Sequence, residues 1–301
     1  MSFQSPSPTL TATPVGSPQA ARTGREADRI CVVVPCYNEA ARLQPAAFLA
    51  ALRDQPALDL LMVNDGSRDQ TIAVLAALAR RAGGRIRVLD LPRNGGKAEA
   101  VRQGLTEALR AGYGIVGYWD ADLATPLDDI ADFARVMRRL PDVEVVFGSR
   151  RALLGHRIRR TLRRRIISRI CSWLARLAVR QSVGDTQCGA KLLRNTPDLH
   201  SALAEGFTAG WLFDVELFSR ITRNGGPREG SFYEYPLPQW TEVAGSKVST
   251  GAVLASGVRM LRLIAGARLP GITFGVPAGQ PANLDRPPRQ GEAGPLAGAR
   301  P

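Results

Sequence analysis

Two aspartates one residue apart, Asp120 and Asp122, are the residues whose type and spacing most directly suggest chemistry. They follow the apolar run 114–119, which predicts a buried strand. Open α/β sheets bind ligands beyond the carboxyl ends of their strands, and paired carboxylates at that edge suit a hard divalent cation that holds a diphosphate. An Asp-x-Asp sequence is also typical of turns and helix caps, so the pair alone leaves both interpretations open.

The elements that would position these aspartates alternate along residues 28–150. Short apolar runs predict strands at 30–34, 58–63, 86–91, 115–119 and 143–147. Apolar residues at three- and four-residue spacing predict amphipathic helices around 39–53, 70–82, 97–111 and 127–139. Strands that alternate with helices in this way predict an α/β fold, with a mostly parallel sheet flanked by helices.

Nearly every predicted strand ends in a polar cluster, and the rule for open sheets brings these clusters to one crevice. One of them, Gly95-Gly96-Lys97, presents backbone N–H groups and an ammonium to an anion, without the spacing of a P-loop or a G-x-G-x-x-G fingerprint. Any single cluster also fits a turn or an N-cap, whereas the whole set favours a phosphate site. The clusters are Pro35 to Glu39, Asn64 to Ser67, Arg93 to Lys97, Asp120 to Asp122 and Gly148 to Arg150.

The composition limits the class of protein. The 301 residues include 40 basic and 27 acidic side chains, for a formal net charge of +13, and 45% are apolar, enough for one large domain or two small ones. The four cysteines and two histidines lack zinc-type spacing, which predicts a reduced, cytosolic setting without structural zinc. No uncharged apolar stretch reaches about 18 residues, so no membrane span is expected.

The chain is expected to divide into four parts. Residues 1–27 are rich in Ser, Pro, Thr and Ala, lack the features of a signal peptide, and predict a disordered tail. Residues 271–301 include twelve Gly or Pro and predict a second disordered tail. Between the tails we expect a folded domain over 28–247 and an amphipathic C-terminal helix over 248–270.

Residues 150–180 carry eleven arginines beside apolar residues at three- or four-residue steps. One interpretation is a basic amphipathic helix that lies on an anionic membrane surface. A core-facing helix with a solvated basic face, or a nucleic-acid patch, fits the composition at least as well. Residues 248–270 are expected to add a second surface contact. Attachment of this kind should be peripheral and sensitive to salt.

The ordered set of motifs resembles the family 2 glycosyltransferases of the GT-A fold. The first half contributes Val33 to Glu39, Val63 to Thr71, Arg93 to Lys97 and Asp120 to Asp122. The second half is similar to the dolichyl-phosphate β-glucosyltransferases and their bacterial polyprenyl-phosphate relatives, through Gly148 to Arg150, Asp185 to Leu192, Trp211 to Leu217 and Trp240 to Lys247. Single motifs are common, but the series over about 28–265 is specific, and it implies a GT-A domain over 28–247.

The resemblance implies a role for each matching position. Asp120 and Asp122 would hold Mg²⁺ or Mn²⁺ and the donor diphosphate, and together with Arg150 they form the implied catalytic set. The implied contacts to the nucleotide sugar are Pro35, Tyr37, Glu39, Asn64, Asp65, Lys97, Asp120, Asp214 and Lys247. The implied contacts to the acceptor phosphate are Arg150, Arg164, Asp185 and Gln187. Asn64 departs from the many members with Asp there; an amide keeps an acceptor and adds a donor.

The implied reaction is the inverting transfer of a hexose, glucose from UDP-glucose, to polyprenyl or dolichyl phosphate at a membrane surface. A lipid phosphate has a second pKa of about 6 and is already a dianion at neutral pH, so no general base is required. A divalent ion and basic side chains would offset the repulsion between acceptor and donor. The expected location is the cytoplasmic face of the membrane, without nucleic acid as a partner. Mannose from GDP-mannose, a soluble acceptor, and a non-enzymatic basic protein that binds membrane or nucleic acid stay open as alternatives.

Overall fold

The computed structural model describes residues 29–150, 157–159, 176, 179, 183–225, 230–241, 256–259 and 261. The predicted tails, 1–27 and 271–301, lie outside these residues. Of the predicted C-terminal helix over 248–270, the residues 256–259 and 261 are described and are helical.

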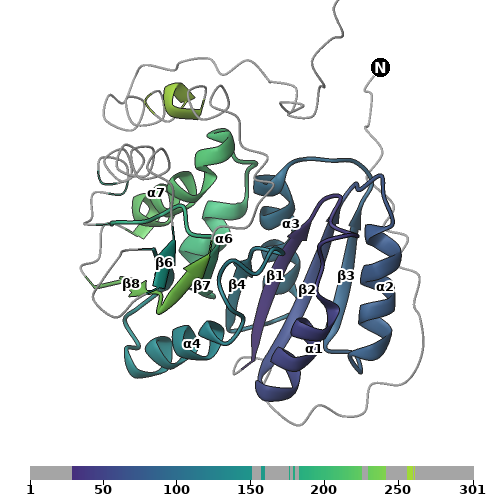
Figure 1. The fold of residues 1–301 in the computed structure, drawn as a ribbon. Coiled ribbons are helices and arrows are strands. Elements are labelled where there is room, and N and C mark those ends of the chain that lie inside the picture. Colours follow the sequence, from purple (N-terminus) through teal and green to yellow (C-terminus); the bar gives the residue numbers. More distant parts are fainter. Residues whose placement is uncertain are drawn as a thin grey trace, which may run out of the picture.

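A seven-stranded sheet forms the centre of the protein, in the order β3-β2-β1-β4-β7-β5-β8 (Figure 1). Neighbouring strands are parallel except at β7, which is antiparallel to both β4 and β5. The predicted α/β fold with a mostly parallel sheet is therefore confirmed. The strands are β1 (Ile30–Cys36), β2 (Leu58–Asp65), β3 (Ile86–Leu91), β4 (Ile115–Trp119), β5 (Val145–Ser149), β7 (Ala190–Arg194) and β8 (Phe232–Pro236).

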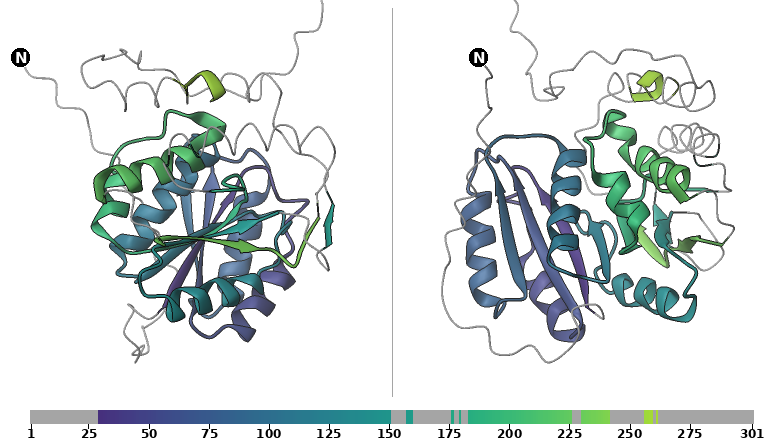
Figure 2. Two further views of the ribbon diagram at one scale, coloured as in Figure 1. Left: turned by 90° about the vertical axis from the view of Figure 1, so that its left-hand side faces the viewer. Right: turned by 180° about the vertical axis from the view of Figure 1, so that it is seen from behind.

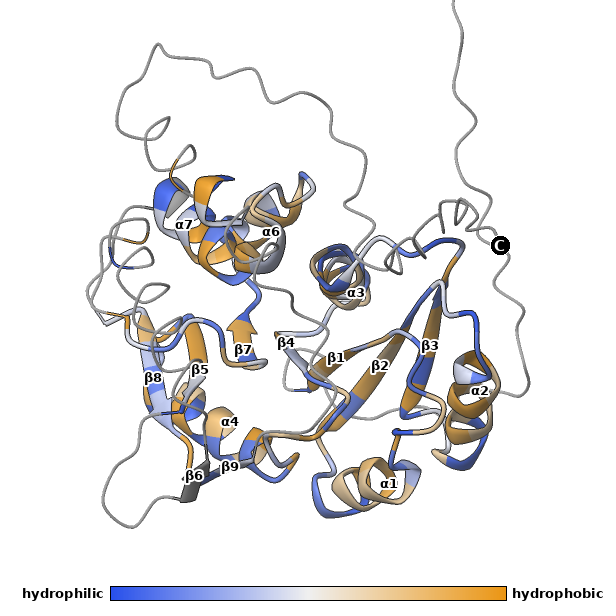
Figure 3. Ribbon diagram, turned by 45° about the horizontal axis from the view of Figure 1, so that its top comes forward, coloured by the Kyte–Doolittle hydropathy of each residue, from blue (hydrophilic) through white to orange (hydrophobic). Residues whose placement is uncertain are grey.

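Helices cover both faces of the sheet (Figures 2 and 3). One apolar core joins Cys31 and Val33 of β1 to α3, α6 and α7, and the other joins Val32 and Val34 to α1, α2 and α4. Strands buried on both faces need continuous apolar runs, which explains why β1 and β2 were recognisable from the sequence. The helices are α1 (Pro45–Asp54), α2 (Thr71–Arg81), α3 (Lys97–Arg110), α4 (Asp129–Arg139), α6 (Pro197–Leu203) and α7 (Phe213–Gly225), with the 3-10 turn η2 (Gly210–Leu212).

Gly104 allows α3 to lie close to the sheet. A Cβ at this position would meet Val33 and would approach Val63 Cγ2 to 2.9 Å. Because real Cβ atoms do not come this close, a larger residue would push α3 outward. The first residue of α3 is Lys97, so this packing also fixes the distance of that side chain from the sheet edge.

Two parts of the structure differ from the sequence-based predictions. The strand β7 was not predicted; it lies between β4 and β5 and pairs Lys191 with Tyr118 and Phe147. The amphipathic helix predicted within 150–180 is wrong at 157–159, which form strand β6 (Arg157–Arg159) paired in parallel with β9 (Gln239–Thr241). In both cases pairing with a distant segment decides the conformation, and a local pattern does not record it.

The topology brings the predicted polar clusters to one edge. The parallel strands β1, β2, β3, β4 and β5 all end there, followed by the clusters described above. Because β7 runs the opposite way, its first residue Ala190 pairs with Trp119, the last residue of β4. Residues 183–189, which precede β7, therefore approach the same edge.

Candidate active site

Asp120 and Asp122 lie in a tight turn directly after β4. The Asp120 N–H donates to the Gly189 carbonyl oxygen (3.0 Å), and Asp122 Oδ1 accepts the Ala124 N–H (3.1 Å). Leu123 has a φ of +54°, a left-handed conformation that is unfavourable for a residue with a side chain. The turn therefore holds both carboxylates at the carboxyl edge of the sheet.

A cation already lies beside Asp120. Lys97 places its Nζ 2.5 Å from Asp120 Oδ1. Burial disfavours the charge of Lys97, but the nearby carboxylates of Asp120 and Asp214 outweigh it and raise the lysine pKa. Burial, and then the charge of Asp120, raises the pKa of Asp122. The raised pKa of Lys97 indicates a site that favours positive charge.

The aspartate pair fits a divalent ion that is bound together with a diphosphate. In the part of the chain that the structure describes, no group of three or more His, Cys, Asp or Glu side chains could hold a metal by itself. Mg²⁺ is commonly held by one or two carboxylates, with substrate phosphates and water as its other ligands. The ammonium of Lys97 at Asp120 shows that this position accepts a cation. Asp120 and Asp122 would thus be two of the ligands that such an ion needs.

Asp65 binds the glycine-rich loop before α3. Its two carboxylate oxygens accept the backbone N–H groups of Gly95 (2.7 Å) and Gly96 (2.9 Å). Burial raises the pKa of Asp65, and these two hydrogen bonds oppose the rise. The sequence predicted that these amides face an anion. The structure shows that the anion is an internal carboxylate, which shapes the loop that carries Lys97 and leaves fewer donors for a ligand.

The side-chain amide of Asn64 forms a hydrogen bond through its nitrogen but not through its oxygen. Its Nδ2 donates to Asp90 Oδ1 (2.7 Å), whereas its buried Oδ1 has no hydrogen-bond partner. An aspartate at this position would face the Asp90 carboxylate at hydrogen-bond distance, so the amide suits this chain better. The unpartnered oxygen is an acceptor at the end of β2, where a nucleotide base is expected.

Hydrogen bonds join the loops that follow β1 and β2. The Asn38 N–H donates to Ser67 Oγ (3.0 Å), and Asn38 Oδ1 accepts the Arg68 N–H (2.9 Å). The Glu39 N–H donates to Thr71 Oγ1 (2.8 Å). These bonds fix the predicted nucleotide contacts, of which Pro35, Tyr37 and Glu39 are partly exposed at this edge.

Two residues predicted to bind the acceptor phosphate, Arg150 and Asp185, are bound to each other. The guanidinium donates twice to the carboxylate, each time at 2.7 Å, and the Arg150 N–H donates to the same group at 2.9 Å. The side chains are 12% and 5% exposed, and the guanidinium carbon lies 5.3 Å from the Trp240 ring centroid. The structure therefore brings the pair together, and a phosphate at Arg150 would compete with Asp185.

Sequence reasoning missed Glu234, which supports this pair. Its carboxylate accepts from Ser149 Oγ (2.6 Å) and from the Gly184 N–H (2.8 Å), so it ties together the residues that precede Arg150 and Asp185. No local pattern around Glu234 marks it, because the contacts span long separations. Gln187, which was predicted to contact the acceptor phosphate, lies in the loop 183–189 together with Asp185. Its buried Nε2 has no hydrogen-bond partner.

A buried polar cluster lies beneath the site and contains Lys191, Asp214 and Tyr118. Lys191 Nζ is 2.9 Å from Asp214 Oδ1, which also accepts the Tyr118 hydroxyl, and Lys191 donates to the Cys188 carbonyl oxygen. Burial lowers the pKa of Lys191 and raises that of Asp214, while their contact stabilises both charges. The role of Asp214 as a sugar contact stays a prediction; the structure gives its carboxylate internal partners.

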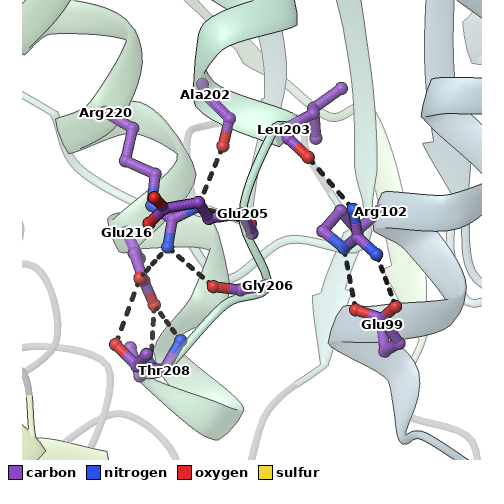
Figure 4. Close-up of polar contacts among 10 residues, drawn as sticks. Glu99, Arg102, Ala202, Leu203, Glu205, Gly206, Thr208, Glu216 and Arg220 are labelled. Atoms are coloured by element: carbon purple, nitrogen blue, oxygen red, sulfur yellow. Dashed lines mark hydrogen bonds and ion pairs between the residues drawn. The ribbon is translucent and has the colours of Figure 1, made fainter. Parts of the chain in front are cut away.

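The helix that carries Asp214 is anchored by a second network (Figure 4). Glu216 accepts the backbone N–H groups of Thr208 (2.8 Å) and Ala209 (2.6 Å) and pairs with Arg220 (2.7 Å). Arg102 of α3 pairs with Glu99 and donates to the carbonyl oxygen of Leu203 in α6 (3.1 Å). These contacts join α3, α6 and the start of α7 into one support for the site.

Two predicted site residues, Arg164 and Lys247, lie outside the described residues. Their proposed contacts stay predictions. In the residues that the structure does describe, no helix is both long and apolar enough to cross a membrane.

Gly189 has no room for a side chain. A Cβ there would collide with the Asp120 carboxylate. Gly189→Ala is therefore expected to displace that carboxylate and to lower kcat/KM for the sugar donor by about a hundredfold. Gly206→Ala is the matched control, since a Cβ there has open space. Steady-state kinetics would measure the effect, and thermal unfolding would confirm that both variants are folded. Full turnover by Gly189→Ala as well as by Gly206→Ala would contradict the expectation.

Comparison with known proteins assigns the chain to a family. The profile described as Glycosyl transferase family 2 matches residues 31–202. A dolichyl-phosphate beta-glucosyltransferase of Drosophila melanogaster is 31% identical over 239 residues, which cover 73% of this chain and 69% of the relative. The Homo sapiens protein of the same description is 30% identical over 243 residues, with the same coverage.

Solved structures share the fold. Glucosyl-3-phosphoglycerate synthase from Mycobacterium tuberculosis in complex with UDP superposes with a TM-score of 0.57 at 18% identity, over 79% of each chain. The complex of that protein with Mn²⁺ and UDP-glucose gives a TM-score of 0.58 at 18% identity, over 79% of this chain and 78% of the other. At such low identity the likeness shows the fold alone, and the predicted GT-A fold is confirmed. The match to the family profile, with a relative that is 31% identical, establishes that this chain is a glycosyltransferase that belongs to family 2.

Proposed function

We propose that the chain transfers glucose from UDP-glucose to a polyprenyl or dolichyl phosphate, with inversion at the sugar and with help from Mg²⁺ or Mn²⁺. The observation that carries the proposal is the meeting of Asp120, Asp122 and Lys97 at the carboxyl edge of the sheet. The choice of glucose as the sugar and of a lipid phosphate as the acceptor is supported by relatives described as dolichyl-phosphate beta-glucosyltransferases, which match along most of their length.

On the donor side, the chain supplies ligands and a basic group. Asp120 and Asp122 would hold the divalent ion, which when bound would offset the charge of the diphosphate and stabilise the departing nucleotide. Lys97 would contact the diphosphate from the start of α3. The partly exposed Tyr37 and the free amide oxygen of Asn64 lie at the ends of β1 and β2, where they support binding of the nucleoside.

On the acceptor side, a phosphate dianion attacks the anomeric carbon directly, so the chain need not remove a proton from it. Arg150 would bind this phosphate, which would compete with Asp185 for the guanidinium. The unpartnered Nε2 of Gln187 is a further donor in the same loop. A buried donor without a partner is uncommon, and binding of an acceptor phosphate would satisfy it.

We further propose peripheral attachment to the anionic cytoplasmic surface of a membrane. Val258 and Leu261, in the described piece of the C-terminal segment, are 47% and 51% exposed. Ser256 of this piece is buried and accepts the Trp211 N–H (3.1 Å), which anchors it to the domain. An anchored helix that exposes apolar residues in a chain of net charge +13 suits an anionic lipid surface. Most of the predicted basic segment 150–180 lies outside the described residues.

Transfer to lipid can be measured directly. Purified protein, polyprenyl phosphate in anionic vesicles, Mn²⁺ or Mg²⁺, and labelled UDP-glucose are expected to give label in the organic phase that EDTA abolishes. Sedimentation of the same mixtures should show binding to vesicles at low salt and release at high salt.

The other outcomes separate the alternatives. Label from GDP-mannose alone would replace glucose by mannose as the sugar. Release of UDP only with a soluble acceptor would contradict the lipid-phosphate assignment. A product that retains the donor configuration would contradict inversion, and a protein that stays in solution with anionic vesicles at low salt would contradict direct attachment.

A further inference from the structure

Lys97 occupies the side of Asp120 where a metal ion would bind. Its ammonium lies 2.5 Å from Asp120 Oδ1, and the two side chains are 43% and 36% exposed. We propose that Lys97 is an internal counter-cation, which holds Asp120 until a nucleoside diphosphate arrives and so makes metal binding depend on the donor. This inference rests on the metal-dependent donor binding proposed above.

The surroundings of Lys97 favour this arrangement. Asp214 also raises the pKa of Lys97, and it already has Lys191 and the Tyr118 hydroxyl as partners. Asp122 also raises the pKa of Lys97, but its Oδ1 accepts the Ala124 N–H, and the ion pair that the structure gives Lys97 is with Asp120. Asp120 is therefore the carboxylate that pairs with the ammonium. The ring centroid of Tyr118 lies 6.0 Å from Lys97 Nζ, a distance at which the ring also attracts a cation.

A divalent ion and the ammonium would repel each other if both were bound to Asp120. Without a diphosphate, the ion must displace Lys97 and leave its charge without a partner. With a diphosphate present, both cations can be accommodated, because the phosphate oxygens supply negative charge for the ion and for the displaced ammonium. Binding of the ion and of the nucleotide should therefore be coupled, each raising the affinity for the other by the same factor.

A lysine at position 97 also suits a side chain that must exchange one anionic partner for another. Of the 40 basic residues only three are lysines, Lys97, Lys191 and Lys247. A guanidinium binds a carboxylate through a rigid fork, as Arg150 does with Asp185. An ammonium is a compact charge on a flexible stem, so it can exchange one anionic partner for another. Lys97 also begins α3, and its side chain can turn without moving the helix.

The experiment compares binding of Mn²⁺, measured by electron paramagnetic resonance of the free ion, with and without UDP. In the unmodified protein, UDP is expected to tighten Mn²⁺ binding by about tenfold or more. Lys97→Met should bind Mn²⁺ about tenfold more tightly than the unmodified protein when UDP is absent, and UDP should then tighten Mn²⁺ binding by a smaller factor than in the unmodified protein. Lys97→Arg, which keeps the charge in a more rigid form, should bind Mn²⁺ without UDP no more tightly than the unmodified protein.

The outcomes decide the inference without reference to the acceptor. If Lys97→Met binds Mn²⁺ alone no more tightly than the unmodified protein, while its thermal unfolding shows a folded chain, the counter-cation role is wrong. If UDP tightens Mn²⁺ binding equally in both proteins, the coupling does not run through Lys97. If the coupling depends on Lys97 but no label enters lipid, the inference stands and the acceptor assignment fails.

Discussion

Replacing Asp120 with asparagine is expected to lower kcat/KM for glucose transfer by about a thousandfold. The substitution keeps the shape of the side chain and the backbone hydrogen bond to Gly189, but removes the charge that would hold the divalent ion. Loss of metal stabilisation of the leaving diphosphate is worth several kcal/mol, and about 4 kcal/mol corresponds to a thousandfold in rate. Lys97 would also lose its ionic partner.

Initial rates over a range of UDP-glucose and Mn²⁺ concentrations would measure the effect. Asp128→Asn is the matched control, because Asp128 lies just before α4, is exposed, and makes no capping hydrogen bond through its side chain. It should leave the rate within about twofold, as surface substitutions usually have small effects. A fully active Asp120→Asn would show that the aspartate pair is not the metal site.

Replacing Lys191 with methionine is expected to destabilise the protein by about 3–5 kcal/mol. Lys191 is fully buried and Asp214 is 4% exposed, so removal of the ammonium leaves a carboxylate away from water with the Tyr118 hydroxyl as its remaining partner. The Cys188 carbonyl oxygen also loses its donor. Because Cys188 precedes Gly189, the turn that holds Asp120 should shift as well.

Urea unfolding of single and double variants would separate charge from packing. Lys191→Met with Asp214→Asn removes both charges and keeps similar volumes, so it should recover more than half of the lost stability. If the double variant is as unstable as the sum of the two single variants, the buried pair makes no specific contribution. The loss would then be attributed to packing alone.

The sequence predicted those elements that depend on local pattern. The strands β1 to β5 are apolar runs bounded by turn residues, and α3 and α4 repeat apolar residues with helical spacing, so their bounds agree with the structure within a few residues. The antiparallel β7 was missed because its five residues, AKLLR, include a lysine and a terminal arginine and have no alternating pattern. Its conformation comes from the two strands that it joins.

The sequence predicted where the candidate site lies, but it did not predict which side chains of the site contact each other. The polar clusters meet at one edge, as the topology of parallel strands requires. Which side chains pair is set by contacts between distant residues: Asp65 with the loop before α3, Arg150 with Asp185, and Lys97 with Asp120. The burial of Lys191 could not be inferred, since a lysine in a short motif is usually exposed.

The reversed direction of β7 bears on where the chain can tolerate insertions. The chain leaves the sheet after Ser149 and comes back at Ala190, and because β5 and β7 are neighbours the two points lie at the same edge. A stretch that starts and finishes at adjacent points can vary in length at small entropic cost, without changing the register of the strands. A change of length within this stretch would therefore leave β4 and β5 in register, provided that Gly189, which contacts Asp120, keeps its place before β7.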